Sequence, residues 1–179
     1  MSENPTPDMT CVPYRRKGLY FVLTVPFVLI MLAVFIYLWR YSFLLSLAYL
    51  GFYFMTSFFQ AYCCAYQDCP YVGKFCPAVI GIYPGNMFAK WLYSNKKIVR
   101  SKKKFEQSVT WALVGWGGLI ILPLYWLSRL SIWWAVGYAA AHVVYTLIFW
   151  LTICPVCAIR NTCPGGKLYN MVAGRREQG

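Results

Sequence analysis

Acidic residues and histidine are scarce in this 179-residue chain. It contains five Asp and Glu residues and one histidine, and charged residues of both signs make up 12% of the sequence. Soluble domains carry about 25% charged residues. Apolar residues account for 60% of the chain and aromatic residues for 20%. This composition excludes an ordinary soluble domain, a disordered chain and a collagen-like chain, and it predicts a membrane protein.

Long apolar runs take the place of the missing charge. A helix needs about 20 mostly apolar residues to cross a hydrocarbon core of about 30 Å. We therefore predict an all-α membrane protein with four transmembrane helices arranged as two helical hairpins, each followed by a cytoplasmic cysteine cluster. The four predicted spans are 18–38, 41–62, 108–126 and 132–153. The predicted regions are an N-terminal tail (1–17), a first hairpin (18–62), a cysteine-rich basic loop (63–107), a second hairpin (108–153) and a cysteine-rich C-terminal tail (154–179).

Small residues in the third predicted span indicate where helices pack. Gly115, Gly117 and Gly118 carry no side chain that would keep a neighbouring helix at a distance. We expect close helix approach at these positions.

Ionisable residues are missing from the interior of the predicted spans. No Asp, Glu, Lys or Arg lies inside any of them, which argues against a proton pump or an ion-coupled transporter built from this chain alone. The single histidine, His142, lies in the fourth span with Tyr138 and Tyr145 at helical spacing. One histidine excludes a haem held between two histidines of this chain. His142 is either a neutral side chain bonded to a neighbouring helix, a hydrogen-bond donor to a quinone carbonyl, or a haem ligand alone or with another subunit.

Basic residues are distributed unevenly about the predicted spans. Of the seventeen Lys and Arg residues, all but Arg40 and Arg129 lie before the first span, between the second and third, or after the fourth. The positive-inside rule then predicts a multi-pass protein of a prokaryotic cytoplasmic membrane with both termini in the cytoplasm. The basic run 96–104 is expected to meet anionic lipid head groups or an acidic soluble partner. No fold that would present it to nucleic acid is evident, so nucleic acid is not an expected partner.

Cysteine is absent from the short turns predicted at the outer face. All eight cysteines lie on the side predicted to be cytoplasmic, where a reducing environment disfavours structural disulfides. The same placement argues against a thiol oxidase, which would need cysteine pairs on the outer face. Clustered thiols in a reducing compartment most often bind metal or iron–sulfur clusters.

The spacing of the cysteines defines two candidate ligand segments. They read Cys64-x4-Cys69-x6-Cys76 and Cys154-x2-Cys157-x5-Cys163. Proline follows four cysteines directly, and a Cys-Pro pair that closes a cysteine run is a feature of bacterial ferredoxin motifs. The predicted ligands are Cys64, Cys69, Cys76, Cys154, Cys157 and Cys163, with Cys63 and Cys11 as alternates.

Other chemistry fits some of these thiols. Cys154-Pro-Val-Cys157 would also suit a zinc site, which takes four ligands. Cys63 and Cys64 lie where a cysteine can be palmitoylated. Buried cysteines can also act as small hydrophobic side chains. A carrier of soft metals or thiols using the Cys63–Cys64 pair is a further alternative.

Two stretches resemble the membrane ferredoxin family, which includes quinol-dehydrogenase subunits with paired inner-face Cys-Pro motifs. They are Cys64-x4-Cys69-Pro70-Tyr-Val-Gly73 and Cys157-x5-Cys163-Pro164-Gly165, within the same four-helix layout. The family motif is Cys-x-x-x-Cys-Pro, so the spacings here are longer. The resemblance implies [4Fe–4S]-type clusters and electron exchange with quinol.

These observations lead to one functional prediction and one alternative. We predict a membrane electron-transfer subunit that binds one or two cysteine-ligated iron–sulfur clusters at the cytoplasmic face. It would relay electrons between a redox partner, soluble or in the membrane, and a carrier such as quinol, together with other membrane subunits. No acid–base or nucleophile constellation is visible, so a redox subunit is expected instead of a stand-alone enzyme. The alternative is a non-catalytic accessory subunit with a structural zinc site or unliganded cysteines.

Overall fold

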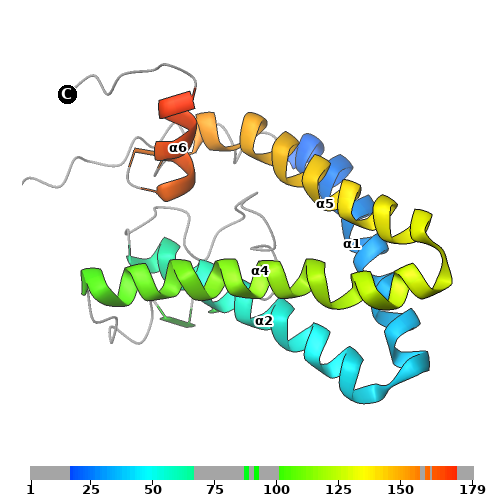
Figure 1. Cartoon of the computed structure of the whole chain (residues 1–179). Coiled ribbons are helices and arrows are strands. Elements are labelled where there is room, and N and C mark those ends of the chain that lie inside the picture. The colour runs from blue at the N-terminus through cyan, green and yellow to red at the C-terminus, as the bar shows by residue number, and fades with distance from the viewer. Residues whose placement is uncertain are drawn as a thin grey trace, which may run out of the picture.

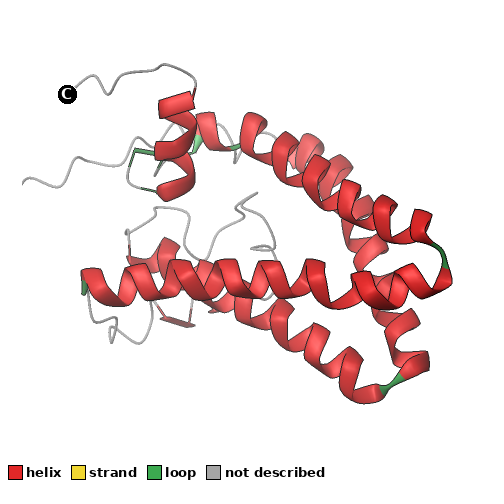
Figure 2. Cartoon of the chain, in the orientation of Figure 1, coloured by secondary structure: helices red, strands yellow, loops and turns green. Residues whose placement is uncertain are grey.

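The described part of the chain is built from helices. A computed structural model describes residues 17–66, 87–88, 91–92, 101–157, 160–161 and 163–172. Figure 2 shows that regular structure within these residues is helical. The elements are α1 (Lys17–Tyr41), α2 (Phe43–Tyr66), α4 (Lys102–Leu130), α5 (Ile132–Thr152), the short 3-10 helix η3 (Cys154–Val156) and α6 (Pro164–Val172).

Four of these helices, α1, α2, α4 and α5, are long and apolar enough to cross a membrane, which confirms the predicted number of spans. With 25 residues and a rise of 1.5 Å per residue, α1 is about 37 Å long, more than the hydrocarbon core requires. Helices α1 and α4 extend beyond the predicted limits at both ends and α2 at its C-terminal end, because helical hydrogen bonding continues into sequence that hydropathy does not detect, whereas α5 stays within its predicted limits. Helix α4 begins at Lys102, and α2 ends at Tyr66 and so includes Cys63 and Cys64.

Single serines join consecutive helices at one end of the molecule. Ser42 connects α1 to α2, and Ser131 connects α4 to α5. The Ser131 backbone is extended, and its side chain accepts a hydrogen bond of 3.3 Å from the Trp133 N–H, so it caps the start of α5. Figure 1 shows both turns at one end, and the end of α2, the start of α4, the end of α5 and α6 at the other.

Helices α2 and α4 lie side by side along much of their length (Figure 1). A side chain at Gly115 would collide with Thr56, and a Cβ atom at Gly118 would lie 2.6 Å from the Phe52 ring. Both positions therefore need glycine for this approach, as predicted. A Cβ atom at Gly117 would have no other atom within 4 Å, so this glycine does not take part in the contact.

Helix α5 is linked to each of the other three long helices by aromatic side chains. The Tyr145 ring stacks on Phe27 of α1, with centroids 4.0 Å apart and an interplanar angle of 7°. The Tyr138 hydroxyl donates to the Leu119 carbonyl of α4 at 2.8 Å and lies 3.1 Å from the Tyr49 hydroxyl of α2. The centre of the molecule is therefore held by buried hydrogen bonds as well as by apolar packing.

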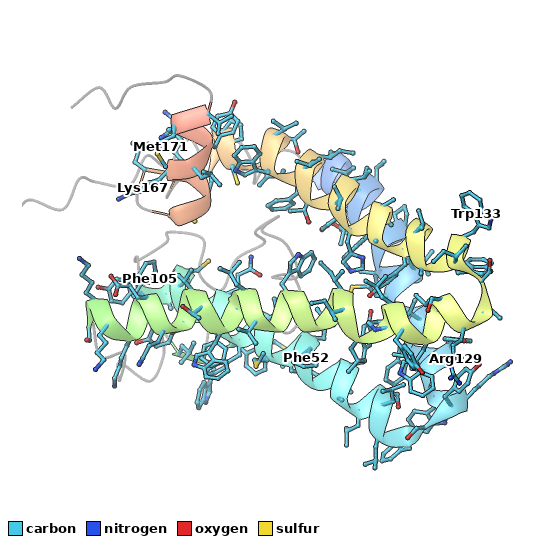
Figure 3. All side chains as sticks on the ribbon, viewed as in Figure 1. Phe52, Phe105, Arg129, Trp133, Lys167 and Met171 are labelled. Carbon is cyan, nitrogen blue, oxygen red and sulfur yellow. The ribbon has the colours of Figure 1, made fainter. Side chains whose placement is uncertain are left out.

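The outer surface of the long helices is apolar. Val22, Leu44 and Trp133 are 70%, 73% and 79% exposed, and many other large apolar side chains are exposed with them. Contiguous apolar surface of this extent is unusual for a soluble monomer and is suited to lipid or to other membrane subunits. Figure 3 places Trp133 and Arg129 at the end with the two serine turns, and Phe105 and Lys167 at the opposite end.

Candidate functional site

Five cysteines of the two candidate segments lie at the end of the molecule opposite the serine turns. Each is a half-buried thiol: Cys63, Cys64, Cys154, Cys157 and Cys163. The other predicted ligands, Cys69 and Cys76, and the alternate Cys11 lie outside the described residues. The first segment starts on the last turns of α2, and the second runs from the end of α5 into α6.

The second cysteine segment folds as a series of hydrogen-bonded turns, each of which begins at a cysteine. The Cys154 carbonyl accepts from the Cys157 N–H at 3.3 Å, and the Cys157 carbonyl accepts from the Arg160 N–H at 3.2 Å. The Cys163 carbonyl accepts from the Lys167 N–H at 2.9 Å, the first hydrogen bond of α6. A local hydrogen bond thus fixes the backbone carbonyl of each of the three cysteines.

Three contacts anchor the second cysteine segment, two of them to α5 and one within the segment. The Trp150 indole N–H donates to the Gly165 carbonyl at 3.0 Å, and its ring meets Tyr169 edge-on with centroids 5.8 Å apart. Within the segment, Gly166 lies against the backbone of Arg160, and a side chain at this position would collide with it. The glycine that follows Cys163-Pro164-Gly165 is therefore required for the fold of the segment.

The folded chain brings cysteines from its two halves together. The Cys163 sulfur lies within electrostatic range of Cys63, on the last turns of α2, and of Cys154, after α5. The end of α2 is held in turn by Tyr66, whose ring stacks on Phe105 of α4 with centroids 4.8 Å apart. Cys63, an alternate ligand on the basis of spacing, thus lies near Cys163 of the second segment.

Protonation of Cys154 is set by its surroundings. Burial raises the pKa of the Cys154 thiol to about 11, and the electrostatic interaction with Cys163 adds to the effect. Nearby, the Arg160 guanidinium donates to the Pro155 carbonyl at 2.7 Å. At neutral pH the metal-free Cys154 is a thiol, so a metal ion would have to displace its proton on binding.

The described residues do not by themselves complete a metal site. No group of three or more His, Cys, Asp or Glu side chains in the described ranges is arranged to hold a metal ion. The type of donor nevertheless fits soft metals, because thiolates are the ligands of zinc and of iron–sulfur clusters. Among the described cysteines, Cys163 interacts electrostatically with Cys63 and with Cys154, and these three thiols do not make up a metal site as they stand.

A second polar feature lies at the centre of the molecule, around His142. The His142 side chain is 1% exposed, and its Nδ1 atom donates to the Tyr138 carbonyl of the same helix at 3.0 Å. Its ring meets Phe27, Trp116 and Tyr138 with centroids 4.8, 5.6 and 4.3 Å apart. The expected bond to a neighbouring helix is not made by Nδ1, which is bonded within α5. Nε2 is buried and has no hydrogen-bond partner among the described residues.

Sequence spacing identified part of this central site. Helical periodicity places Tyr138 and Tyr145 on the same face as His142, and all three are buried. Phe27 and Trp116 come from α1 and α4, and nothing in their local sequence indicates a contact with His142. Ser57 of α2, whose buried hydroxyl also lacks a partner among the described residues, was not singled out either.

The chain was also compared with known proteins. No family model, curated protein or solved structure matches it. Its function is therefore inferred from the residues and contacts described above.

Proposed function

We propose that this protein is a membrane electron-transfer subunit whose cysteines bind one or two iron–sulfur clusters at one end of the helices. The observation that carries the proposal is the position of Cys163, within electrostatic range of both Cys63 and Cys154. Cysteines from the two halves of the chain can then contribute to one centre. Electrons would pass between a redox partner at this end and a membrane carrier such as quinol.

The number of thiols favours iron–sulfur clusters over a single zinc ion. A zinc site is complete with four ligands, whereas this chain has eight cysteines, of which six are in the two segments and a seventh, Cys63, directly precedes the first. The proposed ligands are drawn from Cys63, Cys64, Cys69, Cys76, Cys154, Cys157 and Cys163. When bound, a cluster supplies a one-electron redox couple. The protein would tune its potential through burial and hydrogen bonds to the sulfur atoms.

We further propose that the cysteine end faces the cytoplasm of a prokaryotic cell and that the long helices form two hairpins. Basic residues support this orientation, because most of those described lie at the cysteine end of the helices. Lys102, Lys103, Lys104, Arg160 and Lys167 are at that end, and Arg40 and Arg129 are at the serine turns. Both termini would then be cytoplasmic, and other membrane subunits would cover part of the exposed apolar surface.

The alternative is an accessory subunit with a structural zinc ion or unliganded thiols. The raised pKa of Cys154 favours it, because a buried thiol that stays protonated can serve as a small hydrophobic side chain. The two functions differ in what the purified protein contains and in what the loss of a cysteine changes.

Metal analysis after anaerobic purification tests the proposal. We expect iron and acid-labile sulfide in equal amounts, and an electron paramagnetic resonance signal on reduction with dithionite. Cys163→Ser should lower the iron content, whereas Lys167→Ser, an exposed change in the same segment, should leave it unchanged. Zinc alone, or a colourless protein without metal, would overturn the proposal.

Substitution within the intact complex separates the two functions further. In an electron-transfer subunit, Cys69→Ser and Cys163→Ser should each alter the redox spectrum of the assembled complex. If these variants impair assembly while the surviving complex keeps an unchanged spectrum, the accessory function is the correct one.

A further inference from the structure

The protonation pattern of His142 can be assigned from its hydrogen bond. A carbonyl oxygen only accepts, so the Nδ1 atom that lies 3.0 Å from the Tyr138 carbonyl must carry a proton. In the neutral imidazole the other nitrogen then has a lone pair and no proton. Nε2 is therefore a hydrogen-bond acceptor. A contact in which it donates to a quinone carbonyl, one of the possibilities considered from the sequence, would require a charged imidazolium.

This acceptor is left unsatisfied in the centre of the molecule. Nε2 is buried and has no partner among the described residues, although buried polar atoms in proteins are nearly always hydrogen-bonded. Two hydroxyl groups on the same face of α5 are engaged elsewhere. Tyr138 donates to the Leu119 carbonyl at 2.8 Å, and the Tyr145 hydroxyl lies 3.3 Å from the Thr24 hydroxyl of α1. Neither of them bonds to Nε2, so a bound molecule that carries its own donor would satisfy this acceptor.

The groups around the acceptor are flat and apolar. Phe27 and Trp116 bring aromatic rings from α1 and α4 to the His142 ring, and their own centroids are 6.0 Å apart. Phe27 is 4% exposed, whereas Trp116 is only half-buried. Of these two rings Trp116 is thus the one that reaches the surface, and both rings can stack on a planar molecule.

We infer that His142 forms an intramembrane binding site for a planar aromatic ligand that carries a hydroxyl group, with Nε2 accepting the hydrogen bond of that hydroxyl. Phe27, Trp116 and Tyr138 bound the site. The hydroquinone class meets this description and dissolves in the membrane. Naming it as the natural ligand rests on the proposed electron-transfer function, whereas the acceptor site itself follows from the geometry around His142.

Nitrogen NMR tests the inference directly, because a chain with one histidine gives imidazole signals from His142 alone. The full-length protein is labelled with imidazole-15N histidine and placed in lipid vesicles under anaerobic conditions. We expect one protonated, pyrrole-type signal from Nδ1 and one unprotonated, pyridine-type signal from Nε2. Addition of tetramethylhydroquinone should shift the Nε2 signal, and the matched tetramethylbenzoquinone, which has the same ring without a hydroxyl donor, should not.

Variants provide a second measurement. His142→Phe keeps an aromatic ring but removes the acceptor, and it should weaken tetramethylhydroquinone binding about tenfold, the effect of one lost hydrogen bond to a buried group. Tyr125→Phe, a change at an exposed position of α4, is the control and should bind like the parent protein.

Three results would overturn the inference. They are a pyrrole-type Nε2 signal, an Nε2 signal that does not respond to tetramethylhydroquinone, and a signal already shifted by a bound water that the ligand does not change. Each of these can occur in a protein that contains iron. Conversely, a protein that contains only zinc would overturn the proposed function without affecting the NMR result, so the two failures are distinguishable.

Discussion

At the scale of single residues, Gly115 and Gly117 differ in their surroundings although both lie on α4. A side chain at Gly115 would meet Thr56 of α2, and one at Gly117 would meet no atom within 4 Å. Gly115→Ala should therefore lower the free energy of unfolding by about 1–3 kcal/mol, as overpacking does in other tightly packed sites. Gly117→Ala should leave it unchanged or raise it, because alanine favours the helix.

Thermal unfolding of both variants in detergent, followed by circular dichroism, measures this difference. Equal melting temperatures for the two variants would show that α2 and α4 do not approach each other at Gly115.

The Cys154 thiol gives a prediction about pH. Its pKa is raised from an ordinary 9.0 to about 11, so at pH 8 the thiolate fraction is about one hundredth of that of an ordinary cysteine. In the metal-free protein, alkylation of Cys154 by iodoacetamide should rise about tenfold per pH unit between pH 8 and 10. Peptide mass spectrometry follows the modified residue, with the denatured chain as control.

The sign of the effect on stability follows from the same shift. Between about pH 9 and 11 the unfolded chain has lost this proton while the folded protein keeps it, so the contribution of Cys154 to stability falls as the pH rises. A rate of alkylation that levels off near pH 9 in the folded protein would contradict a raised pKa.

The sequence predicts the chemical character of individual residues better than it predicts which residues contact one another. The identities and spacing of the cysteines indicated soft-metal ligands, but Cys63 was ranked below Cys64. Adjacent residues on a helix point about 100° apart, and only the packing of α2 determines which of them meets Cys163. The burial of His142 followed from its apolar span, whereas the proton on Nδ1 depends on one backbone hydrogen bond.

At the scale of secondary structure elements, α6 depends on Trp150. The indole N–H of Trp150 donates to the Gly165 carbonyl, and the indole ring contacts Tyr169. Both partners of Trp150 lie within α6. Trp150→Leu should release the helix from α5 and increase amide hydrogen exchange in 164–172 about tenfold, since local opening then costs about one hydrogen bond less.

A matched change at the other end of α5 provides the control. Trp134 is 63% exposed, and Trp134→Leu should leave exchange in α6 unchanged. If the two variants exchange alike in 164–172, α6 is held by contacts other than those of Trp150.

The number of long helices was predictable, but their limits were not. Apolar runs identify the part of a helix that lies in the hydrocarbon core, and all four were found in this way. Lys102, Lys103 and Lys104 belong to α4 because helical hydrogen bonds continue where the sequence becomes polar. The same effect extends α2 to Tyr66, so that Cys63 and Cys64 belong to this helix.

At the scale of the whole molecule, the packing of the helices was less predictable than their order. Connections of one residue, Ser42 and Ser131, would favour packing between the consecutive helices that they join. The most extensive contact is nevertheless between α2 and α4, which are separated by a long segment of sequence. This contact depends on the match of Gly115 to Thr56 and of Gly118 to Phe52, a complementarity between surfaces that hydropathy does not describe.

Orientation in the membrane provides the last prediction. The serine turns lie at one end of the four candidate spans and the five described cysteines at the other, so Ser42 and Ser131 should share one side of the membrane and these five thiols the opposite side. In intact cells, a membrane-impermeant maleimide should label Ser42→Cys and Ser131→Cys from outside. The parent protein, whose eight cysteines are predicted to face the cytoplasm, should stay unlabelled until the cells are opened. The parent protein is thus its own control, and labelling of its thiols from outside would reverse the proposed orientation and, with it, the reducing environment on which the iron–sulfur proposal depends.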